Sequence, residues 1–306
     1  MKKIVYSIIL STLVFYILCF PKDAIQAASF GLVLWYTKML PTLLPFAILS
    51  YIFVASGLLE TPCRLLHRCI KWLIPVSPEG VYPLFAGFLF GFPLGSKITA
   101  QLVEEGRMSY GEGNRLFAIC NNISPVFISG FILQTSLQRP DLTAKTLLIL
   151  YLPPLFYFVI TARLFPGKED VMIPQKKAAP RSQISFKIID AGIMSGFETL
   201  TRLGGYIMLF AILSQIVTVL PFQNPALSSL LVGITEITNG TSHLAKAPLP
   251  FREIYLLTVF CTALGGLSGF AQTASMVRKA GLSMGSYVKT KVICSLMSAA
   301  LAVLLP

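Results

Sequence analysis

The chain has 306 residues, of which 55% are hydrophobic and only 12% are charged, and its mean hydropathy is +0.73. These values exclude an ordinary soluble domain, in which roughly 45–50% of residues are apolar and about 25% are charged. The formal net charge of +12 would suit a nucleic-acid-binding protein, but Lys and Arg lie between apolar segments rather than along a stripe. We therefore predict an all-α polytopic membrane protein that binds no nucleic acid.

The predicted elements of the first half begin with an apolar stretch over residues 4–20, which follows Lys2 and Lys3. It is about as long as the shortest helix that spans a bilayer. A cleavable signal peptide is the alternative, because small alanines follow at positions 24, 27 and 28. The other elements of this half are a helix over 30–59, an amphipathic stretch over 61–74, interrupted segments over 81–106 and 110–135, and a helix over 143–165.

The second half repeats this order after a basic, hydrophilic connection. Its predicted elements are a long helix over 188–220, interrupted segments over 226–245 and 253–277, and a final helix over 287–305. The predicted units are an N-terminal signal-anchor helix or signal peptide (1–28), a first repeat with its connecting helix (29–165), a basic cytoplasmic loop (166–187) and a second repeat (188–306).

Polar, Gly-rich interruptions occur at corresponding places in the two halves. Aligning Leu84 with Leu230 without gaps places Ser96 on Ser242. Backbone that is freed from helical hydrogen bonds is tolerated at membrane depth only where protein or a water-filled cavity satisfies it. The paired interruptions therefore predict a central site shared by both halves.

The distribution of basic residues predicts the orientation, because Lys and Arg in short loops are retained in the cytoplasm. If residues 81–106 form a re-entrant hairpin on the cytoplasmic face, most basic residues lie inside, Lys289 and Lys291 included. The hairpin over 226–245 then enters from the outside, so the halves are inverted-topology repeats with re-entrant helices. We expect a multi-pass plasma-membrane protein with a cytoplasmic N-terminus. Hairpins that both span fully are the less favourable alternative, because they move the basic residues near 176 outside.

The first candidate site residues are Asn121, Asn122 and Ser124. Each Asn side chain offers a carbonyl acceptor and an amide donor, so the pair can both accept from and donate to one polar ligand. Ser124 adds a hydroxyl, and Pro125 removes a backbone donor and opens the helix. Hydrogen bonding between helices is the alternative role, because Asn and Ser are common at helix contacts in membranes.

Glu236 is the most informative single residue. A carboxylate in an apolar segment is costly unless it is protonated, paired or hydrated, so it indicates function. The alternative is a structural ion pair with Lys97 or His243. Lys97 is itself a candidate site residue because Gly-Ser precedes it, although a lysine can also extend to a membrane interface. In the long helix of the second half, Glu198 and Arg202 are four residues apart and are expected to pair.

Other kinds of site are not supported. Cys63, His67 and Cys69 lack a further Cys/His pair that would complete a tetrahedral metal site. The sequence contains no nucleotide-binding loop, no nucleophile elbow and no zinc-protease motif. We therefore expect no catalytic residues, no metal and no cofactor, and a protein that is not an enzyme.

Four ordered motifs resemble a known family. They read G-F-P-L-G-S-K-I-T-A from Gly91, N-N-I-S-P-V-F from Asn121, G-I-T-E-I-T-N-G from Gly233 and G-G-L-S-G-F-A-Q-T-A-S from Gly265. These stretches resemble the nucleoside-recognition (Gate) domain family, and their order most resembles its YlbJ-type sporulation integral membrane proteins. The resemblance implies a role in spore development and spore cortex formation. It does not imply that nucleosides are the substrate, because Gate domains also occur in ferrous-iron transporters.

The resemblance and the breaks together predict a transporter-like protein with a midplane site. Glu236 would bind a cation or proton, and Asn121 and Asn122 would orient a small polar solute. The predicted site consists of Asn121, Asn122, Ser124, Glu236, Thr238, Asn239, Ser268 and Gln272, with Lys97 beside it. The expected partners are the lipid bilayer and the solute or ion, and a homo-oligomer or sporulation membrane partners stay open. The alternatives are a membrane scaffold for spore envelope or cortex assembly and, less favoured, an enzyme acting on a lipid-linked substrate.

Overall fold

The computed structural model describes residues 2–58, 60–164 and 185–304, and every regular element in these ranges is a helix. The first half contains α1 (Lys2–Cys19), α2 (Pro21–Leu34), the π-helix η1 (Trp35–Met39), α3 (Leu40–Ser56), α4 (Glu60–Ile70), α5 (Val81–Leu89), α6 (Leu94–Glu104), α7 (Tyr110–Ile119), the π-helix η2 (Phe127–Ser136), the 3-10 helix η3 (Pro140–Leu142) and α8 (Thr143–Leu164). The second half contains α9 (Phe186–Thr218), α10 (Pro225–Thr235), α11 (Ile237–Leu244), α12 (Phe251–Leu264), α13 (Gly266–Val277) and α14 (Met284–Leu304).

Five helical stretches in the described part are long and apolar enough to cross a membrane. They are Pro21–Ser56, Pro140–Leu164, Phe186–Thr218, Phe251–Val277 and Met284–Leu304. The chain is thus an all-helical polytopic membrane protein, as its composition predicts. The predicted basic loop over 166–187 falls almost wholly outside the described residues.

The first long stretch begins earlier than expected. The apolar pattern predicts a helix from residue 30, but α2, η1 and α3 form one continuous helical stretch from Pro21 to Ser56. Proline is favoured in the first turn of a helix, where its missing N–H is not needed, and Asp23 in that turn suits the positive end of the helix dipole. The polar residues before position 30 therefore start the helix rather than interrupt it. The predicted boundary at residue 28 lies inside α2.

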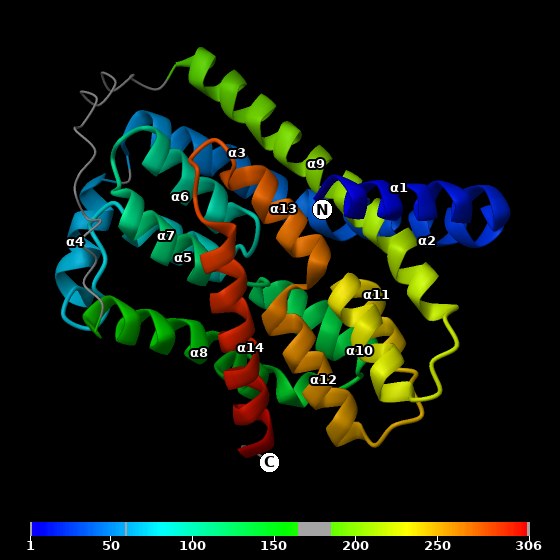
Figure 1. Cartoon of the computed structure of the whole chain (residues 1–306). Coiled ribbons are helices and arrows are strands. Elements are labelled where there is room, and N and C mark those ends of the chain that lie inside the picture. The colour runs from blue at the N-terminus through cyan, green and yellow to red at the C-terminus, as the bar shows by residue number, and fades with distance from the viewer. Residues whose placement is uncertain (1, 59, 165–184, 305–306) are drawn as a thin grey trace.

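This long helical stretch packs antiparallel against α9 (Figure 1). Glycines of α9 face it along its length: a Cβ on Gly196 would lie 2.9 Å from Cγ1 of Ile48, and one on Gly204 would lie 2.8 Å from the ring of Trp35. The indole Nε1 of Trp35 also donates a 2.8 Å hydrogen bond to the carbonyl of Leu200. Small residues let membrane helices approach closely, and that contact replaces the hydrophobic driving force that lipid cannot supply.

Each half then forms a helical hairpin, α5–α6 in the first and α10–α11 in the second. The paired helices touch at glycines. A Cβ on Gly95 would lie 2.9 Å from Cα of Gly87, and a Cβ on Gly240 would overlap Cα of Gly233. The alignment that places Leu84 on Leu230 also places Gly87 on Gly233. The two hairpins therefore share one packing device, whereas their inverted orientation stays a prediction.

Each hairpin is followed by a broken helix, as predicted. The irregular residues 120–124 separate α7 from the helical turn that leads into η2 in the first half. In the second half, α12 ends and α13 begins at Gly265 and Gly266, whose φ angles are 82° and 67°. Left-handed backbone is readily adopted only by glycine, so this glycine pair turns the chain without a side-chain penalty. The breaks lie where the Gly, Ser and Asn clusters of the sequence predict them.

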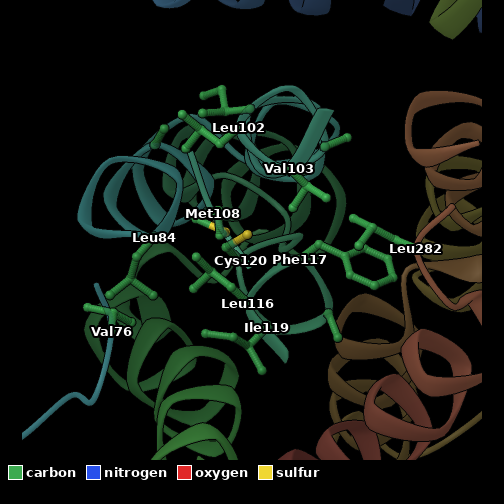
Figure 2. Close-up of a cluster of buried hydrophobic side chains, with 14 of the residues drawn as sticks. Val76, Leu84, Leu102, Val103, Met108, Leu116, Phe117, Ile119, Cys120 and Leu282 are labelled. Atoms are coloured by element: carbon green, nitrogen blue, oxygen red, sulfur yellow. The ribbon is translucent and has the colours of Figure 1, made fainter. Parts of the chain in front are cut away.

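A buried apolar cluster holds the first hairpin against α7 (Figure 2). Figure 2 shows Leu84 of α5 and Leu116 and Phe117 of α7 gathered around Cys120, with Leu282 of the second half beside them. Phe117 and Cys120 are fully buried. The break that follows α7 therefore starts from a rigid, closely packed base.

The contact of the first hairpin with the end of α7 yields a stability prediction. A methyl group on Gly87 would overlap the carbonyl oxygen of Cys120, which is backbone and cannot rotate away. We expect Gly87→Ala to destabilise the purified protein by at least about 1–3 kcal/mol, the usual cost of overpacking. Thermal unfolding in detergent, followed by tryptophan fluorescence, measures the change.

The matched control is Gly205→Ala, because a Cβ on Gly205 of α9 meets no atom within 4 Å. That change should leave the protein unchanged or stabilise it by up to about 1 kcal/mol, since alanine favours the helix. Equal melting temperatures for the two variants would contradict the close contact between Gly87 and Cys120.

Candidate functional site

The predicted Asn pair lies at the first break, where it is tied to the second half. Asn121 donates from Nδ2 to Thr273 Oγ1 of α13 at 2.6 Å and to Tyr287 Oη of α14 at 2.7 Å. Its Oδ1 atom is buried and has no hydrogen-bond partner among the described residues. Asn121 therefore joins three elements and keeps one acceptor unused.

Asn122 meets a residue that sequence reasoning did not select. Its Nδ2 donates to the carbonyl of Ile119 at 2.6 Å, which turns Oδ1 toward α14. There Oδ1 accepts a 3.2 Å hydrogen bond from Nζ of Lys291, a side chain that is only 4% exposed. Lys291 lies about two turns into α14, which begins at Met284, within the helix that the sequence predicts over 287–305, and its cytoplasmic side stays a prediction. The uncharged run over residues 292–306 was the feature of the sequence that could have indicated a lysine buried in an apolar helix.

Ser124 ends the irregular segment and faces a cavity. Its Oγ accepts from the backbone N–H of Phe127 at 3.3 Å, which supports the start of η2. The hairpin tip docks on the same segment, because the N–H of Phe92 donates to the carbonyl of Asn122 at 2.7 Å. Gly91 at this tip has a φ of 82° and lies against Ser124, so a side chain there would be both strained and blocked. The first hairpin and the first break thus form one interlocked unit.

Glu236 lies at the tip of the second hairpin, where it caps α11. One carboxylate oxygen accepts from the N–H of Thr238 at 3.0 Å and the other from the N–H of Asn239 at 2.8 Å. The side chain is 3% exposed and has no ion pair among the described residues. The first turn of a helix leaves N–H groups unsatisfied and carries the positive end of the helix dipole. The alternative of an ion pair with Lys97 or His243 is therefore wrong.

Lys97 lies in α6 and binds α9 instead. Its ammonium donates to the carbonyl of Ser195 at 3.0 Å, to the Ser195 hydroxyl at 2.8 Å and to Thr199 Oγ1 at 2.6 Å. Lys97 therefore attaches the first hairpin to the long helix of the second half, and the structure does not bring it to Glu236. The predicted pair of Glu198 and Arg202 on the same helix is confirmed.

The remaining predicted residues leave buried polar atoms unused. Gln272 donates from Nε2 to Ser268 Oγ at 2.8 Å, while its Oε1 has no partner in the described part of the chain. Thr238 Oγ1 is also buried without a partner. Asn239 reaches only the carbonyl of Ala211, at 3.5 Å. Buried polar atoms are nearly always hydrogen-bonded, so these acceptors and hydroxyls indicate where water or a polar ligand would bind.

A cavity of about 590 Å³ lies between the long N-terminal helical stretch and both hairpin tips. Phe92 of the first tip, Ser124 of the first break and Ile237 beside Glu236 all line it. Its walls are mainly aromatic and aliphatic, and the polar groups in them are Thr37, Lys38, Thr42, Ser124, Gln134 and Thr135. Of the predicted site residues, Ser124 alone lines this cavity within the described part of the chain.

The cavity has the composition of a ligand site. Such sites are concave, mostly apolar, and carry a few polar groups that fix orientation. The sequence did not single out its polar wall from η1 and η2, because those residues lie in apolar helices with no motif around them. The π-helical turn of η1 that carries Lys38 was likewise not foreseen.

Comparison with known proteins gives one informative relative. The sporulation integral membrane protein YlbJ of Bacillus subtilis (strain 168) is 25% identical over 319 aligned residues, which cover 93% of this chain and 78% of YlbJ. No family model matches the chain. No solved structure matches it. The chain is thus similar to an integral membrane protein along nearly its whole length, in agreement with its apolar helices.

The cap at Glu236 yields a second stability prediction. Glutamine has the same size but only one carbonyl acceptor, so one of the two N–H groups of α11 loses its partner. We expect Glu236→Gln to cost about 1–3 kcal/mol, the penalty for a buried unsatisfied group. The free energy of unfolding from denaturant or thermal melts measures it.

Glu198→Gln is the control, because Glu198 and Arg202 form an exposed pair whose loss costs at most about 1 kcal/mol. If Glu236→Gln lowered the free energy of unfolding no more than Glu198→Gln does, the Glu236 carboxylate would not stabilise the start of α11.

Proposed function

We propose that the chain is a transporter-like membrane protein that moves a small polar solute or ion and is required for sporulation, at spore cortex formation. The observation that carries the transport proposal is the cavity that both hairpin tips reach. Broken helices at membrane depth place free backbone and polar side chains where a solute needs them. Similarity to a sporulation integral membrane protein supports the physiological role.

The cavity suits a solute that carries both apolar and polar surface. Phe90, Phe92 and Phe127 supply aromatic walls, while Lys38 and Gln134 offer a cationic donor and an amide. Asn121 Oδ1, Thr238 Oγ1 and Gln272 Oε1 are buried without partners among the described residues and lie outside the cavity lining, so they would offer further polar contacts if the tips move. Direct hydrogen bonds to such groups supply orientation, and the apolar walls supply contact area.

Glu236 is the candidate for ion coupling. A carboxylate has about four lone-pair positions, and the two N–H groups of α11 use two of them. The others remain for a proton or a cation. Energy would come from an ion gradient or from the gradient of the solute, because the sequence contains no nucleotide-binding loop. The proposal holds for a single chain and for a homo-oligomer.

Filling the cavity tests transport. Gly130 of η2 lines the cavity, and a Cβ there meets no atom within 4 Å. Gly130→Phe should therefore fold normally while its ring occupies the solute space. The purified protein is first screened for thermal stabilisation by nucleosides, dipicolinate-like dicarboxylic acids and divalent cations, since a ligand of the native state raises apparent stability. Uptake of the stabilising compound into proteoliposomes is then compared between variants.

We expect Gly130→Phe to lower uptake at least about tenfold, which corresponds to about 1.4 kcal/mol of lost binding. The control is Gly205→Phe, where the same ring enters open space on α9 away from the cavity. Equal uptake by both variants, or no stabilisation by any compound in the screen, would contradict the proposal.

A membrane scaffold is the second candidate, and α4 favours it. This helix carries Arg64 and Arg68, and Leu65 and Trp72 beside them are 64% and 72% exposed. A basic amphipathic helix with exposed Trp and Leu binds at the membrane interface. In the scaffold alternative, neutralising Lys176, Lys177 and Arg181 in the basic loop, which lies outside the described residues, abolishes sporulation. Under the transport proposal the same change leaves sporulation intact, whereas Gly130→Phe abolishes it.

A further inference from the structure

Lys291 is the buried charge that the proposed transport site does not use. Its side chain is 4% exposed in α14, yet no ion pair with it exists in the described part of the chain. The titratable neighbours of its ammonium are the thiols of Cys294 and Cys120, which carry no charge when protonated. A buried ammonium without a counter-charge is costly, so the surrounding dipoles must compensate it.

The negative end of a half-helix supplies this compensation. α7 ends at Ile119, and Asn122, which accepts from Lys291, is three residues beyond that end. The last carbonyls of a helix lack intrahelical partners and together carry roughly half a negative charge. The Asn122 side chain is held by the Ile119 carbonyl, so its Oδ1 points at the ammonium as a fixed acceptor.

The same end has spare acceptor capacity. Asn121 Oδ1 is buried and has no partner among the residues that the structure describes, and Asn121 is next in sequence to the residue that accepts from Lys291. Both donors of Asn121 are engaged with Thr273 and Tyr287, which fixes its amide in place. Amide oxygens and carbonyls at the C-terminal end of a broken helix are the groups that coordinate monovalent cations in membrane transporters.

We propose that the first break forms a monovalent-cation site and that the Lys291 ammonium fills it as a tethered cation. The first break then needs no free ion, and any free coupling ion acts in the second half. Removing the lysine side chain opens the site to Na⁺ or K⁺. This inference goes beyond the proposed function, because it concerns cation binding and stability and holds whether or not the protein transports.

The experiment compares purified wild-type protein, Lys291→Ala and Lys291→Met by thermal unfolding. The buffer contains choline chloride, whose bulky quaternary ammonium serves as the reference cation, and NaCl or KCl replaces it at constant ionic strength. We expect no cation response in the wild type. Lys291→Ala should melt several degrees lower in choline and recover saturably with Na⁺ or K⁺, as mass action requires of a ligand that binds only the native state. Lys291→Met should melt lower without recovery, because its chain fills the space.

A folded Lys291→Ala protein without a cation response overturns the proposal, and so does a wild type that responds as strongly as the variant. Asn122→Asp keeps the test decisive if Lys291→Ala does not fold. It places a carboxylate beside the ammonium, so it should raise the melting temperature in the wild type and lower it in Lys291→Met. Equal lowering in both backgrounds would show that position 291 carries no cation.

Discussion

The close contact between glycine backbones in each hairpin is the constraint on which the rest of the structure depends. In a bilayer, lipid tails are as apolar as side chains, so helices associate through direct packing rather than through the hydrophobic effect. At Gly87 with Gly95, and at Gly233 with Gly240, no side chain separates the paired helices. A short hairpin can therefore enter the protein, and its tip can reach the interior. Without that approach, the breaks would have no protein around them to satisfy their backbone.

In the two halves, side chains of opposite charge compensate the helix ends. At the tip of the second hairpin, the Glu236 carboxylate lies at the positive end of α11 and accepts two N–H groups. At the first break, the Lys291 ammonium lies near the negative end of α7 and reaches it through Asn122. Each charge is of the sign that the adjacent helix dipole stabilises. The halves thus share a backbone plan and differ in the chemistry that completes it.

Local sequence predicted the elements and the positions of the breaks, because Gly, Pro, Asn and Ser act within a few residues of themselves. It also placed Asn121, Asn122 and Ser124 at the first break. The partners of these residues were not predictable, since the packing of α13 on α6 brings Thr273 there and the packing of α14 on α7 brings Lys291. The predicted start of this helical stretch at residue 30 was wrong because Pro21 and Asp23 favour a helix start in a segment of low hydropathy. The expected partner of Glu236 was wrong for a similar reason: nearby backbone N–H groups satisfy a carboxylate as well as a distant lysine does.

The antiparallel pair formed by α9 and the helical stretch over Pro21–Ser56 has a consequence for how the cavity can open. Glycines 192, 196 and 204 of α9 fit against that stretch along its length, and Trp35 fastens it to Leu200. Sliding or separating the pair would break all of these contacts together. The cavity therefore has one wall fixed by this packing, which bears Lys38 and Thr42, and a second wall made of the two hairpin tips, the first break and η2. Any opening of the cavity would therefore come from movement of the second wall against this frame.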